Sequence, residues 1–240
     1  MRTVRAEGPA ESGTSDGLAW ARFEPARDRE PVAGVVILHG AGSRKESHFD
    51  FARVCAASGL AALAFDARGH GESGAPMDGR ALDDVARMAD LLRGRGGVDA
   101  IGLRGSSMGG YLALAAAREA RAGAVVAICP ASAMGLAAGV RGQRFAFAAD
   151  RNAVVALLKE HDEADAIREL DARGVPVLLL HAEGDEVVPA DHSRALHAAA
   201  PASSKLVVTP GGHHRSIQHD AELQGESVRF LTRALGATAR

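Results

Sequence analysis

The pentapeptide Gly105-Ser106-Ser107-Met108-Gly109 carries the residue best suited to chemistry. Its pattern is G-x-S-x-G, with Ser107 at the centre, an apolar run before it and a strong helix-forming run, 110–117, after it. This context predicts a strand, a sharp turn and a helix, a geometry that strains the central residue and lifts its side chain clear of a sheet. The motif therefore predicts Ser107 as a nucleophile. The alternative is a Gly/Ser-rich loop that binds a phosphate or only turns the chain.

A serine nucleophile needs a base to take its proton and a carboxylate to orient that base. Asp185 follows the apolar run Val177–Leu180 and stands after a glycine, where a tight turn would present one carboxylate. Glu183 and Glu186 are its nearest competitors. An ordinary Gly-Asp turn without a catalytic role is the alternative.

The base should come from the loop after the last predicted strand, Leu206–Val208. That loop contains two adjacent histidines, His213 and His214, and neighbouring loop side chains generally point apart, so the residues alone leave both open. We interpret three other histidines, His192, His197 and His219, as surface residues. The group His213, His214 and His219 lacks the spacing of a zinc site, so we expect no metal.

Two main-chain amides should stabilise the oxyanion of a tetrahedral intermediate. Met108 directly follows the nucleophile, and Ala41 lies in the glycine-containing loop His39-Gly40-Ala41-Gly42-Ser43. The same loop could hold a dinucleotide, but it lacks G-x-G-x-x-G spacing and only Asp66 could bind the ribose. We interpret Arg44 and Lys45, just beyond it, as solvated loop residues rather than ligands of an anionic substrate.

The elements that must position these residues are read from hydrophobic patterning. Continuous apolar runs separated by helical patterns are typical of parallel strands buried on both faces of an α/β fold. Residues 1–17 should pair weakly or fray, and Leu18–Phe23 should be an edge strand. The long interval 131–173 predicts a small lid, with one ordinary helix and a wandering loop as the alternative. The predicted buried strands are Val35–Leu38, Ala61–Phe65, Ala100–Leu103, Val125–Ile128, Val177–Leu180 and Leu206–Val208.

These motifs together resemble the α/β-hydrolase fold of serine hydrolases, close to small esterases and serine-aminopeptidase-like hydrolases. The resemblance covers nearly the whole chain from about residue 35, and it includes the stretch 65–73, which implies a structural active-site rim. It implies the order Ser107, Asp185, His and places the base at the second histidine of a P-G-x-x-H loop. That histidine is His214, with His213 in reserve. It also implies a mostly parallel sheet with helices on both faces.

Composition limits the other functions. The 240 residues suit a single α/β-hydrolase domain, and the net charge of −2 gives no basic stripe for nucleic acid or an anionic membrane. Cys55 and Cys129 lie in apolar surroundings, and we interpret both as small buried side chains. With no visible signal peptide and no apolar run long enough to span a bilayer, we expect a cytoplasmic protein.

We therefore expect a hydrolase of a small-molecule carboxylic ester or related acyl compound, with no cofactor because the nucleophile belongs to the protein. Its triad would be Ser107, Asp185 and His214, with the amides of Ala41 and Met108 as oxyanion donors. A binding protein that lost catalysis is one alternative, and an acyltransferase or peptidase with the same triad is another. Apolar residues in 131–173 suggest an apolar acyl group; they are Met134, Leu136, Val140, Phe145 and Phe147.

Overall fold

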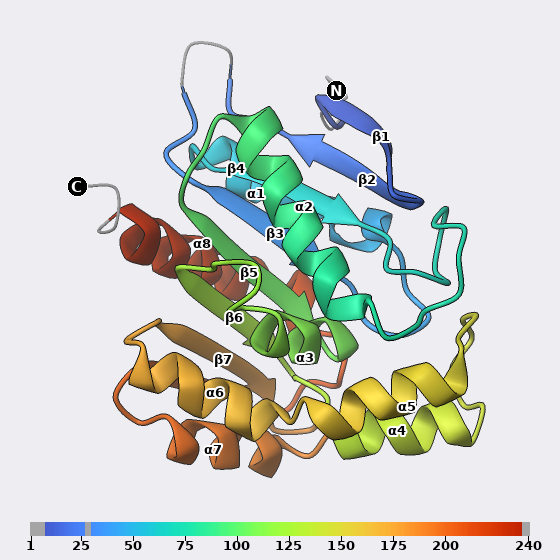
Figure 1. Cartoon of the computed structure of the whole chain (residues 1–240). Coiled ribbons are helices and arrows are strands. Elements are labelled where there is room, and N and C mark those ends of the chain that lie inside the picture. Colours follow the sequence, from blue (N-terminus) through green and yellow to red (C-terminus); the bar gives the residue numbers. More distant parts are fainter. Residues whose placement is uncertain (1–7, 27–29, 237–240) are drawn as a thin grey trace, which may run out of the picture.

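One eight-stranded sheet organises the computed structural model, which describes residues 8–26 and 30–236. The strand order is β1-β2-β4-β3-β5-β6-β7-β8, and helices cover both faces (Figure 1). The strands are β1 (Glu11–Ser15), β2 (Leu18–Phe23), β3 (Gly34–Leu38), β4 (Ala61–Phe65), β5 (Ile101–Ser106), β6 (Ala124–Ile128), β7 (Val177–Ala182) and β8 (Ser204–Thr209). The helices are η1 (Lys45–His48), α1 (Phe49–Ala57), α2 (Ala81–Gly96), α3 (Met108–Ala115), α4 (Ala133–Arg141), α5 (Arg151–Glu160), α6 (Glu163–Ala172), α7 (Ala190–Ala199), η2 (Ile217–His219) and α8 (Ala221–Gly236).

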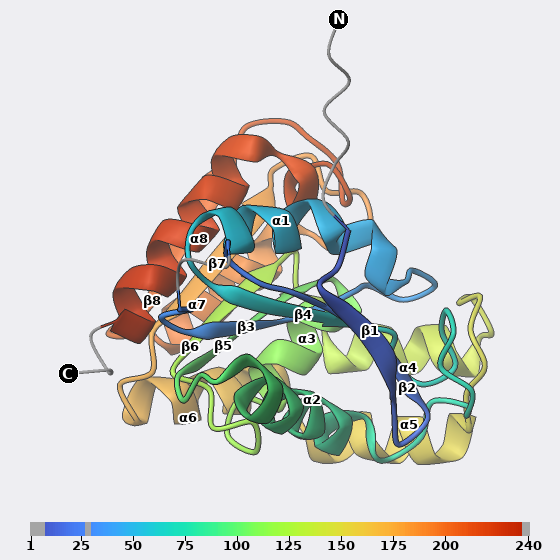
Figure 2. The ribbon, with the colours of Figure 1, turned by 90° about the horizontal axis from the view of Figure 1, so that it is seen from above.

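The six predicted strands are confirmed as β3 to β8, and all of them pair in parallel. The predicted burial holds for β3 to β7 but not for β8, which is the edge strand and is only partly buried. Their continuous hydrophobicity has the expected cause, because successive side chains enter two different cores. Val35 and Ile37 pack toward the face covered by α1 and α8, whereas Val36 and Leu38 pack toward α2 and α3. Figure 2 shows these two helical layers on opposite sides of the sheet. The predicted α/β-hydrolase architecture is thus the one observed.

The N-terminal edge of the sheet differs from the prediction for residues 1–17, of which 1–7 lie outside the described residues. Glu11–Ser15 does not fray but pairs antiparallel with Leu18–Phe23, so β1 is the edge strand and β2 is internal. The link is the two-residue turn Asp16-Gly17, where both residues have positive φ, 51° and 78°. Asp-Gly is a strong signal for such a hairpin, and the hairpin covers the edge of β2.

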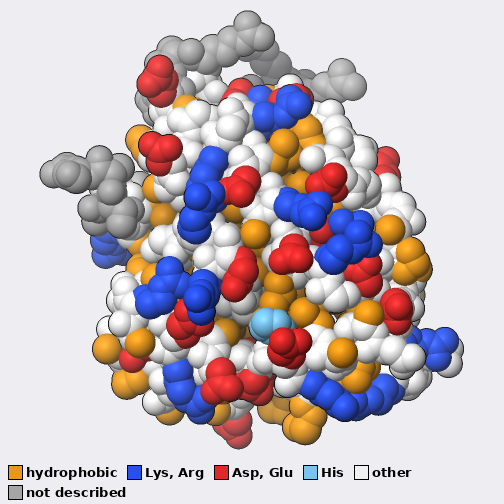
Figure 3. Space-filling model, viewed as in Figure 1, with side chains coloured by type: hydrophobic (Ala, Val, Ile, Leu, Met, Phe, Trp, Pro, Cys, Tyr) orange, Lys and Arg blue, Asp and Glu red, His pale blue; other side chains and the backbone are white. Residues whose placement is uncertain are grey.

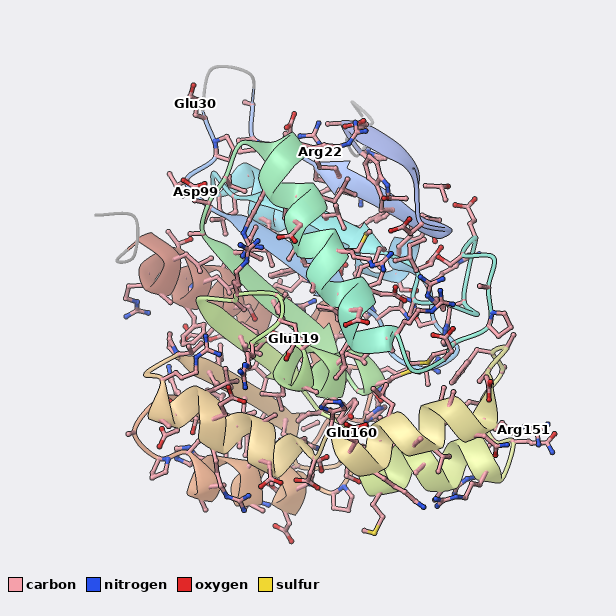
Figure 4. All side chains as sticks on the ribbon, in the orientation of Figure 1. Arg22, Glu30, Asp99, Glu119, Arg151 and Glu160 are labelled. Atoms are coloured by element: carbon pink, nitrogen blue, oxygen red, sulfur yellow. The ribbon has the colours of Figure 1, made fainter. Side chains whose placement is uncertain are left out.

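The interval 131–173 holds three helices rather than one. α4 and α5 pack against each other as a hairpin, whereas α6 packs against α3 and α7 as an ordinary crossover helix on the sheet. Figure 4 marks the two ends of α5 at Arg151 and Glu160, with Arg151 pointing away from the body of the molecule. Only the hairpin, residues 133–160, is extra to the layered fold, so a lid function stays a prediction for that part alone.

Both cysteines are buried free thiols, as predicted. No helix in residues 8–26 and 30–236 is both long and apolar enough to cross a membrane. Figure 3 shows Lys and Arg interspersed with Asp and Glu over one face.

Candidate active site

Ser107 lies at the sharp turn between β5 and α3. Its backbone has φ 55° and ψ −118°, a strained conformation for a residue with a side chain. A Cβ at Gly105 would lie 2.0 Å from the Gly109 carbonyl oxygen, and one at Gly109 would lie 2.3 Å from the Leu38 oxygen. Only glycine fits at these two positions, so the motif is required by the close approach of strand and helix. The Ser107 amide donates to the Ile128 carbonyl at 2.9 Å, which helps to hold the strained turn.

Asp185 lies in the turn after β7, with its side chain fully buried. Its Oδ1 accepts hydrogen bonds from the amides of Val187 and Val188 at 2.8 and 2.9 Å. Its Oδ2 lies 2.7 Å from Nδ1 of His214. Burial alone would raise the pKa of Asp185, but these amide and imidazole donors outweigh it and lower the pKa below the usual range. The carboxylate is therefore charged and fixed in direction.

His214, and not His213, is the histidine whose ring contacts Asp185. The His214 side chain is 9% exposed, and its amide lies 3.3 Å from Oε2 of Glu186. His213 is exposed, and its amide and carbonyl both bond to Ser216 Oγ, at 2.9 and 2.8 Å. Because Nδ1 of His214 donates to the carboxylate, its Nε2 is left free to accept a proton.

Ser107 and His214 line one cavity of about 480 Å³, which we call the histidine cavity. Among the described residues, no hydrogen bond joins Ser107 Oγ to the His214 ring. Such bonds are often loose before substrate binds, so the shared cavity is the relevant observation. The lining residues are Gly40, Ala41, Ser43, Ser47, Ser106, Ser107, His213, His214, Arg215, Ser216, Gln218 and His219.

A second cavity of about 450 Å³ also contains Ser107 and Ala41, and we call it the apolar cavity. Of the five apolar residues predicted to meet an acyl group, Leu136 and Phe145 line it, whereas Met134 is 82% exposed. His192, which we expected at the surface, is half-buried and belongs to this wall because α7 turns it toward the cavity. The remaining lining residues are Ala131, Ser132, Gly135, Arg144, Val187, Val188 and Pro189.

Of the two residues predicted as oxyanion donors, Met108 follows Ser107 directly in the chain and Ala41 lines the same cavities as Ser107. Met108 is the first residue of α3, so its amide belongs to the free N-terminal end of that helix. Ala41 lines both cavities, and a Cβ at the preceding Gly40 would lie 3.4 Å from the Ser107 Cβ. The loop of Ala41 is fixed by His39, whose Nδ1 lies 2.8 Å from the Gly40 oxygen and whose Nε2 accepts from the Ala67 amide at 3.0 Å.

Lys45 is not a solvated loop residue as we expected. Its side chain is 5% exposed, and its Nζ lies 2.9 Å from Oδ2 of Asp66 and 2.5 Å from Oε2 of Glu72. Burial lowers the pKa of Lys45, but the hydrogen bonds that its ammonium donates to neighbouring carboxylates more than offset this and raise the pKa above the usual value. The lysine therefore ties the loop after β3 to the predicted rim and is not available to substrate.

The sequence analysis did not assign to the site two residues that lie near Asp185. Nε2 of the buried His181 lies 3.3 Å from Asp185 Oδ2 and 2.9 Å from the Val188 oxygen, and its Nδ1 lies 2.7 Å from Ser193 Oγ. Cys129 is the other, and burial raises the pKa of its thiol. The sequence signal for His181 was its position, directly after the apolar run Val177–Leu180 and four residues before Asp185.

Ligand atoms of Cys129, His181 and Asp185 lie within 4.8 Å of one another, a spacing that a metal ion would need. The chemistry of this set does not fit one, because both ring nitrogens of His181 have partners in the protein and Asp185 Oδ2 contacts the ring of His214. We interpret the group as packing that supports Asp185.

Arg104 connects the loop of His214 to the strand of Ser107. This β5 side chain is 1% exposed, stacks over the Phe51 ring at 3.8 Å and donates from Nη2 to the Gln218 oxygen at 2.9 Å. Burial lowers its pKa to about 10, so the guanidinium remains charged at neutral pH. Sequence periodicity gave no sign of this contact, because the two residues are far apart in the chain.

Comparison with known proteins places the chain in a family. Residues 29–160 match the family described as serine aminopeptidase, S33, and residues 155–235 match a family described as TAP-like protein. Protein YfhR of Escherichia coli strain K12, described as uncharacterized, is 25% identical over 214 residues, which cover 85% of this chain and 72% of YfhR. YfhR of Salmonella typhimurium strain LT2 is 29% identical over 222 residues, covering 88% and 75%.

Solved structures share the fold. Est1E from Butyrivibrio proteoclasticus with ferulic acid bound has a TM-score of 0.74 at 22% identity, covering 95% of this chain and all of Est1E. A monoacylglycerol lipase from Paleococcus ferrophilus has a TM-score of 0.68 at 21% identity, covering 92% and 98%. The S33 match spans more than half of the 240 residues. The chain therefore belongs to the serine aminopeptidase S33 family of α/β hydrolases, and it is a hydrolase.

Proposed function

We propose that the chain cleaves carboxylic esters through an acyl-enzyme on Ser107. The observation that carries the proposal is the 2.7 Å contact between His214 Nδ1 and Asp185 Oδ2, on the wall of a cavity that also contains the strained Ser107. In this arrangement the carboxylate orients the imidazole and stabilises its charge, and the imidazole takes the proton of the hydroxyl, which is suited to acyl transfer.

The first half of the reaction forms the acyl-enzyme. Ser107 Oγ attacks the ester carbonyl carbon while His214 Nε2 takes the hydroxyl proton, and Asp185 stabilises the imidazolium. The amides of Ala41 and Met108 bind the oxyanion. When the tetrahedral intermediate collapses, the bond to the leaving oxygen breaks and His214 returns the proton to the departing alcohol.

The second half releases the acid. Water attacks the acyl carbon while His214 Nε2 accepts its proton, and the new intermediate breaks the bond to Ser107 Oγ. The serine recovers a proton from His214. Every proton transfer uses groups of this chain or water, so the reaction consumes only the ester and one water molecule.

Peptide hydrolysis is the second candidate, because the family description names an aminopeptidase. An aminopeptidase must hold the charged α-ammonium of its substrate, for which a carboxylate is the natural partner. Among the described residues, no Asp or Glu lines either the histidine cavity or the apolar cavity. This absence favours an ester over a peptide with a free N-terminus.

Hydrolysis of p-nitrophenyl butyrate tests the proposal. Ser107→Ala should lower kcat on the order of 10⁶-fold, to the background rate. Ser12→Ala, which removes an exposed hydroxyl of β1, should leave the rate unchanged. An equal rate in wild type and Ser107→Ala would exclude the mechanism, and an inactive wild type would favour the ligand-binding alternative. Parallel assays with an aminoacyl p-nitroanilide and with an added alcohol acceptor separate the ester, peptide and acyl-transfer reactions.

A further inference from the structure

The two cavities around Ser107 divide the substrate between them. His214 must return a proton to the leaving oxygen, so the leaving alcohol lies on the His214 side of the scissile bond. His214 lines only the histidine cavity. The apolar cavity, which shares Ser107 and Ala41 but lacks both loop histidines, is left for the acyl group.

The apolar cavity has one cationic side chain, that of Arg144. Arg144 is exposed on the connection between α4 and α5, and among the described residues its guanidinium has no ion pair or hydrogen bond. Among the described residues many arginines are paired, as Arg68 is with Asp84 at 2.7 Å, whereas Arg215 in the histidine cavity has no such partner either. A free guanidinium in a cavity that also contains the nucleophile is suited to a planar anionic group of the substrate.

The connection that carries Arg144 is held in place. The Arg144 amide donates to the Gly139 oxygen at 3.0 Å. The ring of Phe145 packs against Gly139, where an added Cβ would lie 2.3 Å from it. Phe147 stacks on His70 with 4.2 Å between ring centroids. The backbone under Arg144 is therefore anchored to α4 and to the rim.

Carboxylates close to these walls already have partners. Glu163 is 5% exposed and accepts from the Ala133 amide at 2.8 Å. Glu186 lies 3.3 Å from the His214 amide, and Asp185 bonds to the His214 ring. With no Asp or Glu lining the cavity among the described residues, a negative charge on the acyl group would meet Arg144 without an opposing charge.

We propose that the apolar cavity binds an acyl chain that ends in a carboxylate, with Arg144 as the residue that recognises it. The substrate class is then the half-esters of dicarboxylic acids: the methylene chain packs on Leu136, Phe145 and Val188, and the terminal carboxylate pairs with the guanidinium. This inference rests on the proposed esterase function and adds its acyl specificity.

A matched pair of substrates isolates the charge. Mono-p-nitrophenyl adipate and p-nitrophenyl hexanoate have the same acyl length and differ in a terminal carboxylate against a methyl group. Adipate is chosen because its carboxylate does not close the five- or six-membered anhydride that would give shorter half-esters a fast background reaction. Wild type should show a kcat/KM about tenfold higher for the adipate.

Variants assign that preference to one residue. Arg144→Gln should lower kcat/KM for the adipate about tenfold and change that for the hexanoate less than about twofold, and Arg144→Lys should keep part of the preference. Arg141→Gln, at the exposed end of α4, is the matched control and should change neither substrate.

Three results overturn the inference: no adipate preference in wild type, an equal loss on both substrates in Arg144→Gln, or a preference abolished by Arg215→Gln instead. Turnover of the hexanoate in these cases would leave the proposed function standing. An enzyme inert toward both esters whose Ser107 also resists a fluorophosphonate would overturn both proposals.

Discussion

Nε2 of His181 lies 3.3 Å from Oδ2 of Asp185, the same carboxylate oxygen that contacts Nδ1 of His214 at 2.7 Å. A buried carboxylate with two imidazoles on one oxygen is held from both sides. His181 touches no reacting atom in the proposed mechanism, so it is a positioning residue for the acid.

His181→Gln should lower kcat about three- to tenfold with little change in KM, because a misdirected Asp185 holds the base less firmly. His197→Gln is the matched control, since His197 contacts Ser204 Oγ at 2.7 Å away from the site. The pH profile of kcat should shift in His181→Gln and not in the control. A variant with lowered thermal stability and an unchanged profile would assign His181 a purely structural role.

The two adjacent loop histidines should behave very differently. His214→Ala removes the proposed base and should lower kcat at least about 10⁴-fold. His213→Ala, which removes an exposed ring while the main-chain bonds to Ser216 remain, should change kcat less than about threefold. Steady-state kinetics on p-nitrophenyl butyrate compare them. The reverse order of effects would place the base at His213.

Stability should fall as the pH drops from about 6.5 to 4. Burial lowers the pKa of His70 from 6.5 to about 4, so the unfolded chain binds its proton first. The stabilisation from the neutral ring is complete above pH 6.5 and is lost on acidification toward the folded pKa, with an upper limit of about 3 kcal/mol. Urea unfolding at pH 7.5, 5.5 and 4.5 measures this loss. His70→Gln should make the pH dependence shallower, and an unaltered dependence would contradict the assignment.

The glycines of the Ser107 turn should be irreplaceable. Gly105→Ala places a Cβ 2.0 Å from the Gly109 oxygen and should cost at least about 2 kcal/mol of unfolding free energy or prevent folding. Gly94→Ala, in α2 where a Cβ meets nothing within 4 Å, should be neutral or stabilising by up to about 1 kcal/mol. Chemical denaturation of both variants tests this, and a fully stable Gly105→Ala would show that the strand and helix do not pack this closely.

Much of the fold could be predicted because the burial of a strand or helix determines its local pattern of apolar and polar residues. The runs at Val35–Leu38 and Val177–Leu180 are apolar at every position, and only strands covered on both faces need that. The β1 hairpin was missed although Asp16-Gly17 signals it, since the flanking residues of β1 are polar and carry no burial pattern.

The site was harder to predict where contacts cross between distant segments. The Ser107 motif is local, so its strained turn was readable. The choice between His213 and His214 depended on resemblance, because periodicity does not say which ring turns toward Asp185. The sequence predicted a solvated Lys45 because its partner, Asp66, lies 21 positions further along the chain and leaves no local pattern.

Labelling with a fluorophosphonate, followed by intact-mass and peptide analysis, tests the central claim most directly. The account predicts one added phosphonyl group per chain on the peptide containing Ser107, lost in Ser107→Ala and strongly slowed in His214→Ala. Label on another residue, or equal labelling of wild type and Ser107→Ala, would contradict it.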